Sequence, residues 1–90
     1  MKLSKETIEL CKTKNIIEFN SQYELQEYLR NEKNLHVDIY LGSKTFKWEI
    51  NNWIIDLKHQ KKIKWTLPTR VYNYYEDALE VCLQEMLKLC

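Results

Sequence analysis

Histidines and carboxylates are the usual source of acid–base and metal chemistry, and this chain has only two histidines, His36 and His59. His36 stands two positions before Asp38, so on a strand their side chains would share one face. An imidazole beside a carboxylate can exchange protons or bind a metal ion. However, no third ligand stands at a spacing typical of a metal site. We therefore expect a solvated pair, no enzyme and no cofactor.

The cysteines are an odd set of three, Cys11, Cys82 and Cys90, and none is part of a CxxC motif. A secreted domain of this size would normally pair an even number of cysteines in disulfides. Cys11 and Cys82 lie on apolar stripes, whereas a catalytic thiolate needs an exposed, electropositive setting. We expect free thiols with a structural role, in the reducing environment of the cytoplasm.

Positive charge is concentrated between residues 57 and 75, where there are five basic residues and no acidic one. The rest of the chain has nine basic and thirteen acidic residues, a net charge of −4. Lysines interleaved with aromatic rings are what phosphate contact and base stacking use, which makes 58–75 a candidate nucleic-acid-binding segment. Its candidate contacts are Lys58, Lys61, Lys62, Lys64, Trp65 and Arg70. The alternative is a solvated strand whose lysines discourage aggregation at a sheet edge.

The composition limits the remaining classes of function. The 90 residues are 44 % hydrophobic and 30 % charged, which is typical of a globular chain and suits one domain over residues 1–90. A single glycine and a single proline exclude phosphate-cradling loops. No apolar run is long enough to cross a bilayer, and the first ten residues do not resemble a secretion signal. We expect no membrane partner.

Two helices are predicted in the first part of the chain. Ser4 and the apolar residues after it indicate a helix over about residues 4–14, followed by a connector, so that 1–20 forms an N-terminal unit. Ser21 and Glu24 form a capping box at the start of a helix over about 22–33. Asn34 would end this helix in the left-handed region.

Alternation of apolar and polar residues then predicts strands. Residues 35–41 and 46–50 form a hairpin around Gly42, with Phe46 on its inner face. After Ile50 the phase changes, so Asn51 and Asn52 make either a turn into a new strand or a bulge within one long strand. Ile63, Trp65 and Leu67 indicate a further strand, which Pro68 ends or places at an edge.

The last helix begins after Asn73, which we expect to be its cap with Glu76 three residues on. Its apolar stripe is formed by Tyr75, Ala78, Leu79, Cys82, Leu83, Met86 and Leu87. The polar residues between them are expected to face solvent. The order α-α-β-β-β-α predicts an α+β fold, with helices packed on one face of a small antiparallel sheet of three strands, or four if Asn51-Asn52 is a turn.

Two stretches resemble a family of small proteins from gut Bacteroidetes, their phages and mobile elements. Residues 28–37, YLRNEKNLHV, are similar to the family's W-L-R-E-x-x-x-I-H-I, and residues 75–89 are similar to its closing Y-E-E-A-L-E-A-G-L-x-E-A-L-K-L. Tyr28 replaces the family's tryptophan, and Val81-Cys82 replaces Ala-Gly. The matching residues belong to cores and caps, so the resemblance implies this fold and brings no activity.

These observations lead to two hypotheses from different classes. The first is a non-enzymatic accessory protein of a phage or mobile element, acting by contact with another protein. If all helices pack on one side of the sheet, the free face would bear His36, Asp38, Tyr40, Lys47 and Glu49. The second is a nucleic-acid-binding module that uses the basic segment. The sequence identifies neither the protein partner nor the oligomeric state.

Overall fold

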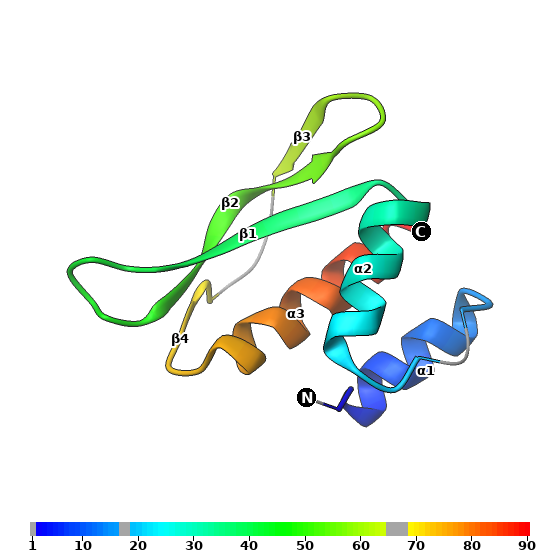
Figure 1. Cartoon of the computed structure of the whole chain (residues 1–90), viewed down its shortest axis with the longest axis horizontal. Helices are drawn as coiled ribbons and strands as arrows, with labels where there is room; N and C mark the ends of the chain where they lie inside the picture. Colours follow the sequence, from blue (N-terminus) through cyan, green and yellow to red (C-terminus); the bar gives the residue numbers. More distant parts are fainter. Residues whose placement is uncertain (1, 17–18, 65–68) are drawn as a thin grey trace.

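A computed structural model describes residues 2–16, 19–64 and 69–90 (Figure 1). Its elements, in chain order, are α1 (Lys5–Thr13), α2 (Gln22–Glu32), β1 (Leu35–Leu41), β2 (Trp48–Asp56), β3 (Lys61–Lys64), β4 (Val71–Tyr72) and α3 (Tyr75–Lys88). The predicted α+β class and element order are confirmed, with β4 as a short strand that the sequence did not reveal. Among the described residues, no helix has both the length and the apolarity that crossing a membrane requires.

The sheet is antiparallel and β2 is its central strand. One side of β2 pairs with β1 along its whole length, and the other side pairs with β4 at Trp48–Glu49 and with β3 at Trp53–Asp56. β1 is therefore one edge of the sheet. The predicted third strand is present as β3, although Trp65 and Leu67 lie outside the described residues.

An irregularity in β2 resolves the choice left open at Asn51 and Asn52. Val37 pairs with Ile54 and Ile39 with Ile50, so two steps along β1 correspond to four along β2. This is a bulge, and because its surplus is an even number of residues the side chains keep their faces. Ile50 and Ile54 consequently both point into the core and are 2 % and 3 % exposed.

Phe46 departs from the prediction. It does not lie on the inner face of the hairpin but in the connecting loop, where φ is 55° and the side chain is 78 % exposed. The turn is longer than expected because Gly42 N–H donates to the Lys47 carbonyl (2.8 Å) and Phe46 N–H donates to the Gly42 carbonyl (2.9 Å). These bonds occupy residues 42–47, and β2 begins only at Trp48.

All three helices lie on one side of the sheet, as predicted (Figure 1). α3 packs against β1, β2 and β4, α2 packs against α3 and β1, and α1 packs against α3. The predicted stripe of α3 is confirmed: Leu83, Cys82 and Leu87 are completely buried. The core also contains Leu3, Cys11, Ile16, Leu25, Leu29, Leu35, Val37, Ile50 and Ile54.

The helix caps follow the sequence in two cases and not in the third. The Oγ atoms of Ser4 and Ser21 accept from the amides of Thr7 and Glu24, each at 3.2 Å. The prediction that Asn73 caps α3 is wrong, because Tyr74 is the N-cap and makes no side-chain capping bond. β4 ends at Tyr72, and this places the first helical turn one residue later than the sequence pattern suggested.

Candidate functional site

No helix or strand that the structure describes covers the face of the sheet opposite the helices (Figure 1). Pairing places on it the residues that alternate with the core positions; we call it the outer sheet face, and it comprises His36, Asp38, Tyr40, Glu49, Trp53, Ile55, Lys62, Lys64 and Val71. Because antiparallel partners on one face lie close together, these side chains form rows across the strands.

Two groups of rows cross the outer sheet face. In the first, Ile55 lies between His36 on β1 and Lys62 on β3, and Trp53 lies opposite Lys64. Both apolar side chains are half-buried, and lysine stems can cover such a surface while their ammonium groups stay in water. The second group is a single row nearer the β1–β2 loop, formed by Tyr40, Glu49 and Val71. Its two apolar members are 48 % and 40 % exposed.

Four of the five residues predicted for this face lie on it: His36, Asp38, Tyr40 and Glu49. Lys47 lies in the loop just before β2. The sequence analysis missed the apolar centre formed by Trp53 and Ile55. The sequence analysis expected the alternation to change phase after Ile50, but the surplus of the bulge is even, so Ile54 stays in the core and Trp53 and Ile55 face outward.

Both histidines contact aspartates, in two separate places. His36 Nε2 lies 2.9 Å from Asp38 Oδ1 on the outer sheet face, and His59 Nδ1 lies 2.9 Å from Asp56 Oδ2 in the β2–β3 turn. The hydrogen bond from the His59 side chain is the main reason why the pKa of Asp56 is lowered. Within the described ranges no three His, Cys, Asp or Glu side chains gather as metal ligands. These pairs stabilise a turn and a strand surface.

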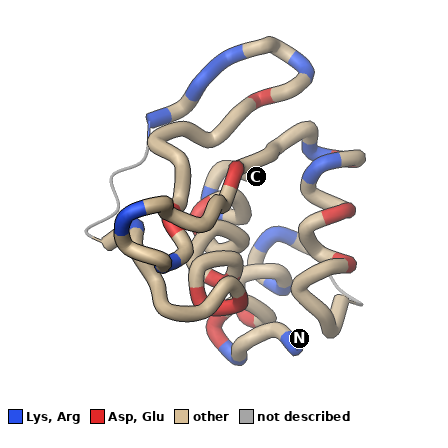
Figure 2. Tube along the Cα trace, turned by 60° about the vertical axis from the view of Figure 1, so that its left-hand side comes forward, with Lys and Arg blue, Asp and Glu red and all other residues tan. Residues whose placement is uncertain are grey.

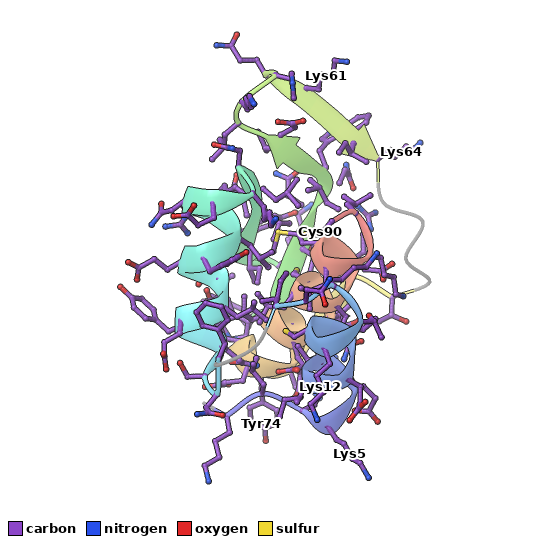
Figure 3. The ribbon with its side chains drawn as sticks, turned by 90° about the vertical axis from the view of Figure 1, so that its right-hand side faces the viewer. Lys5, Lys12, Lys61, Lys64, Tyr74 and Cys90 are labelled. Atoms are coloured by element: carbon purple, nitrogen blue, oxygen red, sulfur yellow. The ribbon has the colours of Figure 1, made fainter. Side chains whose placement is uncertain are left out.

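The lysines of the basic segment lie along the β2–β3 hairpin, which is the loop with blue segments at the top of Figure 2. Lys62 and Lys64 belong to the outer sheet face, but Lys61 pairs with Asp56 on the helix side, and Lys58 lies in the turn. Figure 3 shows Lys61 and Lys64 at opposite ends of β3. The strand therefore divides these lysines between two faces.

The last two residues predicted for nucleic-acid contact lie apart from these lysines. The Arg70 side chain is exposed beside β4, and its carbonyl accepts from the Ile50 amide at 2.8 Å. Trp65 lies outside the described residues. No compact basic strip is formed by the part of the segment that the structure describes.

The thiols are unsuited to nucleophilic chemistry. Cys11 and Cys82 are buried, as predicted, and burial raises the pKa of Cys82 to about 12. Burial is also the main cause of the raised pKa of Cys11. Cys90 is exposed at the end of the chain, but partial burial of its sulfur raises its pKa too. All three are therefore protonated at neutral pH, and a thiol is a poor nucleophile.

A polar cluster between the three helices was not foreseen. Glu80 of α3 accepts from the Ser4 amide (3.0 Å), from the Thr7 hydroxyl and from Gln22 Nε2 (2.8 Å), and Gln84 Nε2 donates to Thr7 Oγ1 (3.1 Å). Burial alone would raise the pKa of Glu80, but the hydrogen bonds outweigh it and the pKa is lowered. The cluster therefore joins α1 and α2 to α3 through an ionised carboxylate. The sequence analysis had placed Glu80 and Gln84 in solvent.

Comparison of the chain with models of protein families, with curated proteins and with solved structures finds no match.

Proposed function

We propose that this chain is a non-enzymatic accessory protein that binds another protein through the outer sheet face. One observation carries the proposal: all helices pack on the other side of the sheet, so Trp53 and Ile55 stay half-exposed, with Tyr40 and Val71 beside them. An apolar surface of this kind on a small domain is typical of an interaction site. The resemblance of residues 28–37 and 75–89 suggests a phage or mobile element as its setting.

The chemistry of the face favours a protein as the partner. Its apolar centre is flanked by Lys62 and Lys64 on one side and by Asp38 and Glu49 on the other. Protein interfaces combine an apolar core with a polar rim of mixed charge. A phosphate backbone, in contrast, would be repelled by the two carboxylates. The surface thus suits a partner with an apolar patch and both signs of charge around it.

The test compares two single variants in affinity capture from a lysate of the organism that encodes the protein. Tyr40→Ala removes an aromatic side chain from the outer sheet face that is 48 % exposed, and Tyr23→Ala removes one from the outside of α2 that is 70 % exposed. We expect the first variant to retain its specific partner about tenfold or more less well, because interface aromatics often dominate binding energy. The second should behave as the wild type.

Equal retention by the Tyr40→Ala variant and the wild type would remove the outer sheet face from the account. Unchanged denaturation midpoints establish that both variants are folded. A second face variant, Lys62→Glu, extends the same comparison to the opposite side of the apolar centre, where the side chain is exposed and its replacement leaves the core untouched.

Nucleic-acid binding is the second candidate, and one pairing favours it: Trp53 lies opposite Lys64, so an aromatic and a basic residue are neighbours on the outer sheet face. Each phosphate contact on a single strand should contribute a log–log salt slope of about −0.7. Fluorescence anisotropy with labelled single-stranded DNA and RNA measures this directly. We expect no appreciable binding at physiological salt; tight binding that Lys62→Glu with Lys64→Glu abolishes would favour this candidate.

A further inference from the structure

Phe46 combines two unfavourable properties at the tip of the β1–β2 hairpin. Its φ of 55° lies in the left-handed region, which costs energy for a bulky side chain. Its ring is also 78 % exposed, the highest value among the large hydrophobic side chains that the structure describes. Strain retained at an exposed position indicates a function for the residue held there.

The loop around Phe46 is rigidly bonded. Thr45 Oγ1 accepts from the Lys47 amide and donates to Glu49 Oε2, each at 3.2 Å. Gly42 has no space for a side chain, because the Glu49 carboxylate and the Thr45 hydroxyl occupy the place of a Cβ atom. These bonds order the backbone that carries Phe46, which lowers the entropic cost of binding through this loop.

Two lysines flank the ring. Lys44 and Lys47 are exposed, and neither takes part in an ion pair among the described residues. The one carboxylate nearby, that of Glu49, is bonded to Thr45. We call Lys44, Phe46 and Lys47 the hairpin tip. Its chemistry, an aromatic ring between two positive charges, would fit an apolar recess with an acidic rim.

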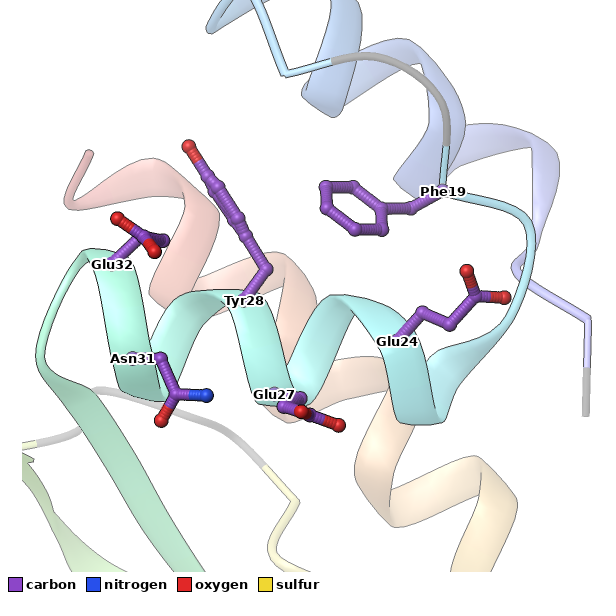
Figure 4. A pocket seen from close by; sticks show the side chains of 6 residues that line it. All are labelled: Phe19, Glu24, Glu27, Tyr28, Asn31 and Glu32. Carbon is purple, nitrogen blue, oxygen red and sulfur yellow. The ribbon is translucent and has the colours of Figure 1, made fainter.

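A shallow, open groove with such a lining lies between α2 and the segment before it, in the same chain. The α2 groove has a volume of about 360 Å³ and is lined by Phe19, Glu24, Glu27, Tyr28, Asn31 and Glu32. Figure 4 shows Tyr28 on α2 and Phe19 on the segment that precedes it, with the Phe19 ring pointing toward Tyr28 and the carboxylates of Glu24, Glu27 and Glu32 along the helix. The ring centroids are 5.0 Å apart at an interplanar angle of 61°, so the exposed ring edges and faces can receive a third ring.

The hairpin tip forms one end of a molecule 40 Å long, and α2 lies toward the other end, so the tip and the α2 groove cannot meet within one chain (Figure 1). We propose that the hairpin tip of one copy occupies the α2 groove of a second copy. Phe46 would enter between the rim and the Phe19–Tyr28 pair, while Lys44 and Lys47 face Glu27 and Glu32. This contact uses a surface different from the outer sheet face, apart from Lys47, which adjoins both.

The arrangement predicts an unusual form of self-association. The two surfaces differ, so the contact is head-to-tail and repeats along a chain of copies unless the geometry closes a ring. A contact between one hairpin tip and one α2 groove is small and should be weak. We expect a dissociation constant of about 1 mM or somewhat lower, which corresponds to a binding free energy of about −4 kcal/mol or stronger. Its charged rim should make it weaker at high salt.

Analytical ultracentrifugation of the full chain tests the proposal, with two variants and their mixture. Phe46→Gly removes the aromatic ring of the hairpin tip and relieves the backbone strain. Glu27→Lys with Glu32→Lys reverses the charge of the α2 groove at two exposed positions. We expect the wild type to exceed the mass of a monomer as concentration approaches about 1 mM. Each variant alone should stay monomeric. When the two variants are mixed, they should form a dimer and nothing larger, because the first keeps only an intact α2 groove and the second only an intact hairpin tip.

Matched controls remove an exposed aromatic ring and an exposed lysine elsewhere, by Tyr74→Ala and Lys5→Glu (Figure 3). Both should associate as the wild type does. A wild type that stays monomeric to about 1 mM overturns the proposal, and so does association that survives Phe46→Gly. Neither result affects the outer sheet face, because the variants used here leave that surface intact.

Discussion

Glu80 shows how far a single residue can differ from what its type suggests. A helix pattern that assigns apolar residues to the core leaves glutamates for the solvent, and Glu80 follows that pattern in the sequence. In the structure it accepts hydrogen bonds from both other helices. The three donors come from residues 58 to 76 positions away, so no local pattern could have paired them. Thr7, completely buried, and Gln22, 4 % exposed, were missed for the same reason.

Replacing Glu80 by Gln should lower the free energy of unfolding at pH 7 by about 1–2 kcal/mol. Hydrogen bonds to a charged group contribute more than this when fully buried, but Glu80 is only half-buried. The replaced side chain keeps its size and loses its charge, and its new amide group faces donors. Urea denaturation of both proteins at pH 7 measures the difference.

The same pair of proteins should differ in pH dependence. The pKa of Glu80 is lowered from its ordinary value of 4.5, so the unfolded chain binds the proton more readily than the folded one. The stability due to this carboxylate is therefore complete above about pH 4.5 and is lost as the pH falls through the lowered pKa. The difference in free energy of unfolding between wild type and Glu80→Gln should narrow as the pH falls below about 4.5 and through the lowered pKa. A gap that stays constant contradicts an ionised, hydrogen-bonded carboxylate.

Phe46→Gly should stabilise the fold even though it removes a large side chain. A left-handed φ costs a non-glycine residue roughly 1–2 kcal/mol, and replacement by glycine removes this cost. Part of the gain in stability is lost, because glycine gives the unfolded chain more conformational entropy. The ring is 78 % exposed, so little burial is lost. We expect a net gain of about 0.5–1 kcal/mol. Phe46→Ala is the control, because alanine keeps the strained φ and should show no such gain.

At the scale of elements, periodicity sufficed wherever one face of an element is buried along its length. α3 repeats its apolar residues without a gap, and β1 has the bounds that alternation predicted, residues 35–41. The β1–β2 hairpin is different, because its far end extends beyond the helices: Leu41 is 52 % exposed although it continues the inner row. There the pattern no longer reports burial, and the position of Phe46 could not be predicted from it. The bulge at Asn51 and Asn52 was one of the two alternatives that the sequence offered, and the register of β1 with β2 decides in its favour.

Helix caps give a direct comparison between a correct and an incorrect prediction. Ser21→Ala removes the oxygen that accepts from the Glu24 amide at 3.2 Å and should cost about 0.5–2 kcal/mol. Asn73→Ala should cost almost nothing, because Tyr74 and not Asn73 is the N-cap of α3. Thermal denaturation of both variants checks the pair. Equal losses would mean that Asn73 caps the helix after all.

Leu83 lies at the centre of the α3 stripe and is completely buried. Leu83→Ala should lower the free energy of unfolding by roughly 2–5 kcal/mol, through lost burial and the cavity left behind. Leu89, after the end of α3 and 47 % exposed, is the matched control for the loss of a leucine. Its replacement by alanine should change stability little. A chemical denaturation midpoint unchanged in the Leu83 variant would show that α3 does not anchor the core.

For the whole molecule, the sequence predicted that the sheet would have a free face and named five residues for it, of which all but Lys47 lie there. It did not predict that Lys62 and Lys64 share this face with His36 and Tyr40, since that follows from the pairing of β3 with β2. The two hypotheses made from the sequence thus share part of one surface, because Lys62 and Lys64 lie on the outer sheet face while Lys61 points to the helix side and Lys58 lies in the turn. Mixed charge around an apolar centre is the property on which our proposal of a protein partner rests.

The class of the partner is the central claim, and affinity capture with and without nuclease tests it most directly. The wild type and the Lys62→Glu/Lys64→Glu variant are each used as bait in lysate of the source organism at physiological salt. We predict that the wild type retains a specific protein in the same amount whether or not nuclease is added, because the contact is made with the protein itself. Retention that disappears on nuclease treatment, and is absent from the lysine variant without it, would contradict the claim and assign the outer sheet face to nucleic acid.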